Sequence, residues 1–139
     1  MYKRISLISL ILVAFFCITS VANATIYSSE YITDCVAQAA RSSGNTITVT
    51  FNISGTGTMD VIGAKTIVIQ EKALGSSSWT AVATMSSNDN SNMLAYNTRR
   101  HASNVYYYGA KSGYQYRAKV YFYAEKGGYD SREFITAAV

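Results

Sequence analysis

Few residues in this 139-residue chain could carry out covalent chemistry. The one histidine, His101, follows Arg99 and Arg100 in a polar segment. No G-x-S-x-G, H-E-x-x-H or Cys–His signature accompanies it, so we interpret His101 as a solvated loop residue. Four carboxylates could meet in space as a glycosidase pair: Asp60, Glu71, Glu125 and Asp130. Their spacing gives no reason to expect such a pair, so we predict a non-enzymatic protein, with a small glycan- or peptide-cleaving enzyme as an alternative.

Metal and cofactor motifs are also missing from the sequence. The segment Asn88–Asn92 offers oxygen ligands of the kind that Ca²⁺ prefers. It has one carboxylate, no glycine at the turn and no trailing glutamate, so we interpret it as an exposed loop and predict neither a metal nor a cofactor. The pair Arg99-Arg100 could be a dibasic processing site that releases a peptide, or a contact for an anionic partner. We interpret it as two solvated loop charges.

Tyrosine is the unusual residue type, with twelve copies in the chain. Tyr106 and Tyr108 flank a third tyrosine, and a strand would present both on one face. Tyr121 and Tyr123 lie opposite the apolar side of another expected strand, together with Arg117 and Lys119. Such a surface could stack on sugar rings or contact a partner protein. Cross-strand aromatic pairs that only stabilise a sheet would give the same pattern, and both interpretations stay open here.

The first 24 residues have the features of a secretory signal peptide. A positive start is followed by an apolar run over 7–18 and by Ala22-Asn23-Ala24, which predicts cleavage between Ala24 and Thr25. An uncleaved membrane anchor is the alternative, although the run is short for one. We therefore expect a secreted, extracellular protein that meets the membrane only during export.

Removal of this segment changes the charge and the cysteine count. Ten Lys and Arg remain against eight Asp and Glu, a formal charge of +2, and no basic cluster predicts nucleic-acid binding. Of the two cysteines only Cys35 remains. In an exported protein such a residue is buried, free or paired with another chain.

The remainder of the chain predicts strands, because β-branched and aromatic residues alternate with polar ones. The expected strands are 46–52, 64–72, 79–85, 93–96, 105–108, 114–125 and 129–138. Ser54–Gly57 is expected to break the chain between the first two, and Gly127-Gly128 to form a hairpin turn. Glu30–Arg41 is expected to form one or two amphipathic helical turns around Cys35, with an edge strand over 26–33 as the alternative.

About seven short strands at intervals of roughly ten residues are typical of an antiparallel β-sandwich. We therefore predict an all-β protein: a signal-peptide helix over 1–24, then one sandwich domain over 25–139, with 25–44 as a lead-in segment.

Two resemblances support this prediction. The alternation Tyr116, Ala118, Val120, Phe122, Ala124, followed by Gly127-Gly128 and Ser131, resembles a strand pair of fibronectin type III and immunoglobulin-like domains. Trp79 with Val82 resembles the start of a middle strand in that family. The resemblance implies an immunoglobulin- or fibronectin-III-like sandwich. The prolines usual in that family are absent, because the chain contains none.

The chain also resembles small exported proteins of uncharacterised function from Gram-positive bacteria. That likeness rests on the signal peptide, the segments 56–60 and 62–64, a tryptophan strand and a final Gly-x-x-Tyr strand pair. It implies no activity. The leading functional prediction is thus an exported, non-enzymatic protein that acts by surface contact with an extracellular protein or glycan. A carbohydrate-binding module using exposed tyrosines is the alternative.

Overall fold

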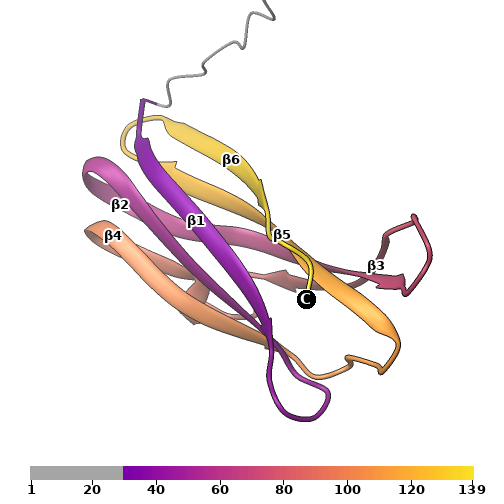
Figure 1. Cartoon of the computed structure of the whole chain (residues 1–139). Helices are drawn as coiled ribbons and strands as arrows, with labels where there is room; N and C mark the ends of the chain where they lie inside the picture. The colour runs from indigo at the N-terminus through magenta and orange to yellow at the C-terminus, as the bar shows by residue number, and fades with distance from the viewer. Residues whose placement is uncertain (1–29) are drawn as a thin grey trace, which may run out of the picture.

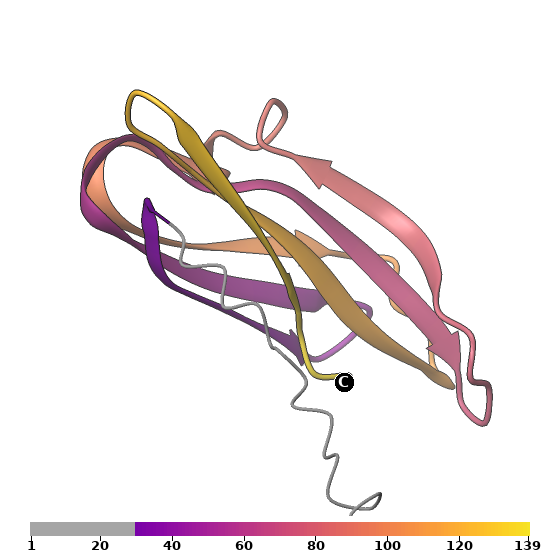
Figure 2. The ribbon, with the colours of Figure 1, turned by 90° about the horizontal axis from the view of Figure 1, so that it is seen from above.

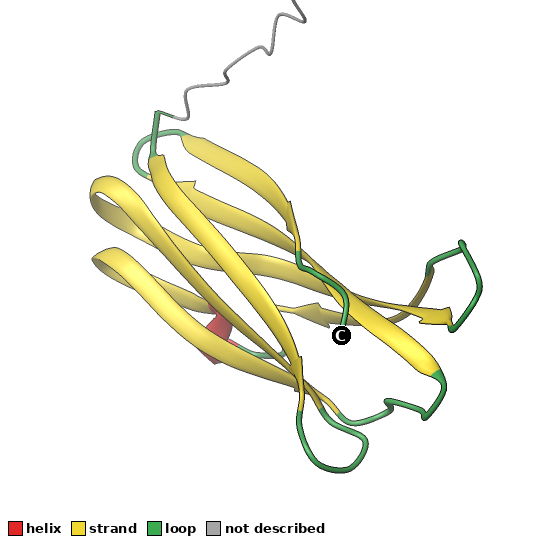
Figure 3. Ribbon diagram, viewed as in Figure 1, coloured by secondary structure: helices red, strands yellow, loops and turns green. Residues whose placement is uncertain are grey.

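A computed structural model describes residues 30–139 of the chain. The predicted signal peptide and its cleavage site at Ala24 and Thr25 lie outside these residues. Six strands follow one another along the chain: β1 (Ile32–Arg41), β2 (Ile47–Ala73), β3 (Thr80–Ser86), β4 (Leu94–Tyr107), β5 (Tyr114–Glu125) and β6 (Tyr129–Ile135). One 3₁₀ turn, η1 (Ser91–Met93), precedes β4, and no α-helix occurs within residues 30–139 (Figure 3). The predicted all-β class is confirmed.

Every strand pairing is antiparallel, and the sheet is organised around the 27-residue strand β2. Its first half pairs with β1 and with the end of β4, its middle pairs with the start of β4, and its second half pairs with β3 and β5. Strand β6 adds to the outer edge of β5. Figures 1 and 2 show β2 bending back at one end of the molecule, so that the sheet curls into a half-barrel.

The bend replaces two predicted chain breaks. Ser54–Gly57 was expected to separate two strands, but β2 runs through it, with a register shift against β4 between Ser54 and Met59. Strand β4 bends alongside, and Asn97 takes the left-handed backbone conformation there (φ 52°). As a result 94–107 form one strand, and the polar segment of His101, predicted as a loop, lies within it. The polar side chains are accommodated because this part of β4 is covered on one face only.

The predicted helical turns over Glu30–Arg41 are wrong, because this segment is strand β1. Its residues Cys35, Ala37 and Ala39 lie on the inner side with a period of two. A register shift between Ile32 and Asp34 brings Ile32 to the same side. This irregularity spaces the apolar residues like one face of a helix, which explains the misreading.

The core lies between the two halves of the curled sheet. Phe51 of the first half of β2 contacts Phe122 of β5, with ring centroids 6.0 Å apart and an edge-to-face orientation. Both rings are buried, as are Ile47, Val49 and Ile53 along the same side of β2. Since the inner faces of the two halves meet in this core, their outer faces point in opposite directions and are available to solvent.

Candidate functional site

The structure divides the six predicted surface residues between these two outer faces. Tyr106 lies on β4, opposite Thr48 in the first half of β2, and Tyr108 follows directly after the strand. The four others lie on the outer side of β5, where Tyr121 is paired with Thr66 in the second half of β2. Arg117, Lys119, Tyr121 and Tyr123 are therefore brought together, and the structure does not bring Tyr106 and Tyr108 to them.

The first outer face, which we call the neutral face, is formed by β1, the first half of β2 and the end of β4. Cross-strand pairing arranges its outward residues in three rows: Ala40–Thr48–Tyr106, Gln38–Thr50–Asn104 and Val36–Asn52–Ala102. No side chain in these rows is charged. The next row along, with Asp34 and Arg100, marks the boundary of the neutral face at the bend.

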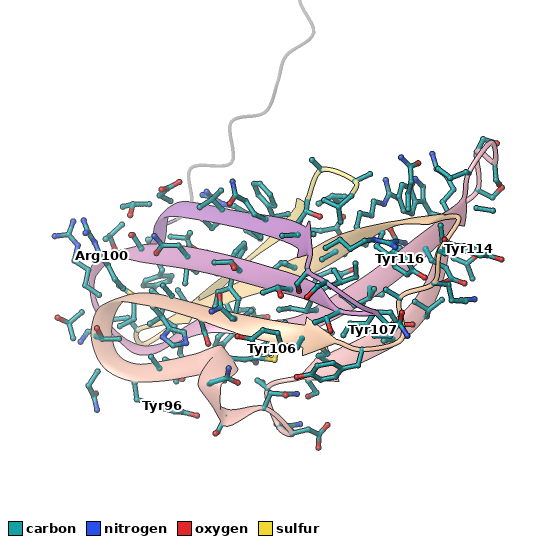
Figure 4. All side chains as sticks on the ribbon, turned by 60° about the horizontal axis from the view of Figure 1, so that its bottom comes forward. Tyr96, Arg100, Tyr106, Tyr107, Tyr114 and Tyr116 are labelled. Carbon is teal, nitrogen blue, oxygen red and sulfur yellow. The ribbon has the colours of Figure 1, made fainter. Side chains whose placement is uncertain are left out.

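Two tyrosine rings form a platform at one edge of the neutral face. Tyr106 is 48% exposed and Tyr108 is 71% exposed, and their rings lie nearly parallel, 19° apart, with centroids 6.3 Å from each other. Figure 4 shows Tyr106 on the β4 ribbon, away from Tyr96 and Arg100 near the bend. An exposed aromatic ring offers an apolar surface with a polar hydroxyl at its edge, which suits the mixed polarity of a sugar ring.

The polar side chains of the neutral face are available for a ligand. Within residues 30–139, Gln38, Thr50, Asn52 and Asn104 take part in no side-chain hydrogen bond. Neighbouring strands lie about 4.8 Å apart and outward residues about 6.8 Å apart along a strand. Amide and hydroxyl groups therefore stand on a regular grid beside the tyrosine platform, each with free donors and acceptors.

A groove borders the neutral face where β1 meets β6. It has a volume of about 510 Å³ and is lined by residues 36–40 of β1, by Thr50 and by Phe134, Ile135 and Ala137. A second hollow of about 210 Å³ shares much of this lining and extends to Asn52. Several of the lining side chains are alanines, whose small size leaves the space open. The described strands β1 and β6 form no ladder here.

At the other end of this seam the two strands are joined by polar contacts. The Tyr31 N–H donates to Asp130 Oδ2 at 2.7 Å, and Arg132 Nη2 donates to the Ile32 carbonyl at 3.3 Å. Cys35 is half-buried beside Arg132, and burial raises the pKa of its thiol. The raised pKa favours the protonated thiol at neutral pH.

The second outer face, which we call the basic face, lies over β3, the second half of β2, β5 and β6. It carries four cations, Lys65, Lys72, Arg117 and Lys119, among the rings of Trp79, Tyr121 and Tyr123. Arg117 Cζ lies 4.3 Å and Lys72 Nζ 5.0 Å from the Trp79 ring centroid. Trp79 directly precedes β3. It is only partly buried, because β3 is an edge strand.

Tyr123 on the basic face is held from several sides. Lys65 Nζ lies 3.7 Å from its ring centroid, and the Tyr129 ring stacks on it at 5.7 Å. Its hydroxyl donates to Glu125 Oε2, and this hydrogen bond, aided by burial, raises the pKa of Tyr123 to about 12. The ring is only 8% exposed, so it supports the face rather than offering a stacking surface.

The residues considered for catalysis have individual structural partners. His101 Nε2 lies 2.7 Å from the Asn92 carbonyl oxygen. Glu71 accepts hydrogen bonds from the Tyr116 hydroxyl and from Lys111 Nζ, at 2.9 and 3.1 Å. Tyr116 is opposite Glu71 and lies nine residues before Glu125 on β5, so about 30 Å of strand separates the two glutamates.

The other motifs also have structural explanations. Arg99 and Arg100 lie in strand β4 and not in a loop, and Arg99 Nε donates to the Gly55 carbonyl at 3.2 Å. The segment Asn88–Asn92 forms a turn stabilised by Ser86. Among residues 30–139 no three His, Cys, Asp or Glu side chains are grouped as a metal site would require.

Sequence reasoning named Tyr106 and Tyr108 but grouped them with residues of the basic face. It missed the rest of the neutral face, as well as Lys65, Lys72 and Trp79 on the basic face. The alternation of Thr and Asn in 46–52 was the available signal. Its neighbours on β1 were hidden by the helical interpretation.

Comparison with known proteins adds no family to these observations. No family model, no curated protein and no solved structure matches the chain significantly. In the part of the chain that the structure describes, no helix is long and apolar enough to cross a membrane.

Proposed function

We propose that this protein is exported, has no enzymatic activity and acts as a glycan-binding module through its neutral face. The observation that carries the proposal is the platform of Tyr106 and Tyr108, two exposed and nearly parallel rings. Beside it stand amides and hydroxyls that make no side-chain hydrogen bond within residues 30–139. An uncharged surface of this composition complements an uncharged glycan, whose hydroxyls need donors and acceptors and whose C–H faces need apolar contact.

The groove between β1 and β6 supports the same proposal. Its position next to Gln38 and Thr50 extends the neutral face from an open platform into a concave site. Ligand sites are usually concave and mostly apolar, with a few polar groups that fix orientation. A chain of several sugars could lie across the strands, stacked on the tyrosines at one end and seated in the groove at the other.

The proposal includes three predictions from the sequence: export, secretion and a relation to small exported proteins of Gram-positive bacteria. So does the finer fold assignment, an immunoglobulin- or fibronectin-III-like sandwich. The curled antiparallel sheet, with its core between two halves, is compatible with that assignment. Contact with an extracellular protein through the neutral face is the second candidate, because exposed tyrosines are also enriched at protein interfaces.

Glycan arrays test the proposal. The chain without residues 1–24 is screened against plant, mucin and bacterial glycans, and the affinity for any hit is measured by titration calorimetry. Replacing both rings (Tyr106→Ala, Tyr108→Ala) should weaken binding about tenfold to a hundredfold, because each stacked aromatic contributes about 1 kcal/mol.

Tyr96→Ala is the matched control. Tyr96 is 64% exposed on the same strand but pairs with Val61, beyond the boundary of the neutral face. Its removal should leave the affinity unchanged. An array without signal, or a signal that the double variant retains, would sink the glycan proposal. Turnover of any glycan by the purified chain would favour the enzyme alternative instead.

A further inference from the structure

Two cations on the basic face lie over one ring, and neither forms a salt bridge within residues 30–139. Lys72 Nζ and Arg117 Cζ lie 5.0 and 4.3 Å from the centroid of Trp79. The salt bridges within residues 30–139 use other lysines: Lys111, Lys119 and Lys126. Both positive charges therefore lie within about 5 Å of the indole centroid and have no carboxylate partner in the described chain.

Arg117 is oriented for an external ligand. Its Nε donates to Gln70 Oε1 at 2.7 Å, across the pairing of β2 with β5. This hydrogen bond fixes the guanidinium plane and leaves both terminal nitrogens free. A guanidinium held in this way can bind two oxygens of a phosphate or sulfate at once.

The positive charge continues along β5. Lys119 stands two residues beyond Arg117, about 6.8 Å away on the same face. It contacts Glu133 only loosely, at 3.9 Å, in an exposed pair that contributes little. Further along lies Lys65, over the ring of Tyr123. The cations form a row along the paired strands β2 and β5, and not a single compact pocket. Glu133 and Glu125 lie beside its Lys119 and Tyr123 end, so the Lys72 and Arg117 end is the more positive.

We propose that the basic face binds a linear polyanion, namely an extracellular glycopolymer that carries phosphate or sulfate groups at regular intervals. Charge complementarity identifies this occupant: Lys72 and Arg117 bind anionic groups beside Trp79, and Lys119 and Lys65 bind later groups of the same chain. A lipid bilayer is the competing partner for this face, because the Tyr129 ring beside Tyr123 is 69% exposed, and the test includes vesicles for that reason.

The proposal does not depend on the glycan function of the neutral face. Trp79 is the only tryptophan in the chain, so its fluorescence reports on the basic face alone. The chain without residues 1–24 is titrated with inorganic polyphosphate, with dextran as an uncharged polymer and with monomeric phosphate. Polyphosphate should change the Trp79 emission and saturate, and dextran should not. Affinity should fall as salt rises, since bound counterions are released.

The test variant is Lys72→Gln with Arg117→Gln, and the control is Arg100→Gln with Lys126→Gln, which removes the same charge elsewhere. We expect the test variant to bind about tenfold more weakly, with a salt dependence lower by about two ions, while the control keeps its affinity within about twofold. Circular dichroism confirms that both fold.

Three results would overturn the proposal. The first is no emission change with polyphosphate. The second is an equal loss of affinity in both variants, since that would show net charge and not the basic face to be responsible. The third is binding to vesicles with phosphatidylglycerol headgroups but not to polyphosphate, since that would identify a membrane as the partner.

Discussion

The hydrogen bond between Tyr123 and Glu125 predicts a specific loss of stability at alkaline pH. In the unfolded chain this tyrosine titrates near its ordinary pKa of about 10. In the folded protein the Glu125 carboxylate and burial raise its pKa to about 12. Because the folded pKa is raised, its contribution to stability is fully present below pH 10. This contribution is lost as pH rises from about 10 through about 12. In that range Tyr123 ionises in the unfolded chain but stays protonated in the folded protein, which favours unfolding.

The magnitude follows from the two pKa values. A shift of two units corresponds to an upper bound of about 2.7 kcal/mol; because solvent screens the hydroxyl and its carboxylate partner, we expect a loss of about 1 kcal/mol by pH 11. Urea unfolding at a series of pH values between 7 and 11 measures this directly. Tyr123→Phe should lack this part of the alkaline loss, because its ring cannot ionise. Glu125→Gln should reduce it, because the neutral amide no longer raises the pKa of the tyrosine.

Tyr108→Phe is the matched control. It removes a hydroxyl from a ring that is 71% exposed, so the alkaline loss should be that of the unchanged protein. The reasoning is refuted if Tyr123→Phe loses as much stability between pH 9 and 11 as the unchanged protein. Direct spectroscopic titration of tyrosinate provides a second measurement, in which one group should vanish from the most alkaline part of the curve in Tyr123→Phe.

Two further substitutions test the fold. Gly63→Ala should destabilise the folded protein by about 3 kcal/mol or more, because Gly63 has a φ of 151° and a β-carbon there would overlap the Met93 carbonyl. Its control is Gly57→Ala, which should cost less than about 1 kcal/mol because no atom lies near the added β-carbon. Equal unfolding midpoints for the two variants would contradict this. Tyr116→Phe should cost about 1–3 kcal/mol in urea unfolding, because it removes the hydroxyl that donates to the largely buried Glu71. A change below about 0.5 kcal/mol would show that water replaces this contact.

The strand β5 could be predicted at its observed bounds because its sequence contains the whole signal. Tyr116, Ala118, Val120 and Phe122 alternate strictly with polar residues, and each is completely buried. Both β2 and β5 present one face to the core along their length, so buried and exposed residues alternate with a period of two in the sequence. The turn at Gly127 follows directly, and its φ of 73° is one that glycine adopts readily.

Strand β1 and the bend of β2 could not be predicted in the same way. A single irregularity after Ile32 changes the apparent period of β1, and only the pairing of Ala37 with Phe51 reveals which face is inside. In β2, Gly55 and Gly57 were interpreted as a chain break. Glycines also permit a bend within a strand, and the choice depends on partners that are distant in sequence.

The surfaces were harder to predict than the strands, because each face combines residues from several strands. Tyr106 and Tyr121 belong to similar alternating segments, and the sequence does not tell which half of β2 each segment meets. The register of strand pairing shows which half each segment meets: Thr48 lies beside Tyr106, and Thr66 lies beside Tyr121. A grouping by local pattern therefore joined residues that the fold places on opposite sides of the core.

This separation has a consequence for function. The same strand, β2, contributes Thr48 and Thr50 to the neutral face through its first half, and Gln70 and Lys72 to the basic face through its second half. Because Phe51 and Phe122 fill the space between the halves, one ligand on the neutral face leaves the basic face free. If both proposals hold, the protein can hold an uncharged glycan on one side and an anionic polymer on the other. The Tyr106/Tyr108 and Lys72/Arg117 variants should then each weaken one binding activity at least about tenfold and preserve the other. Joint loss in a folded variant would instead place both ligands on a single face.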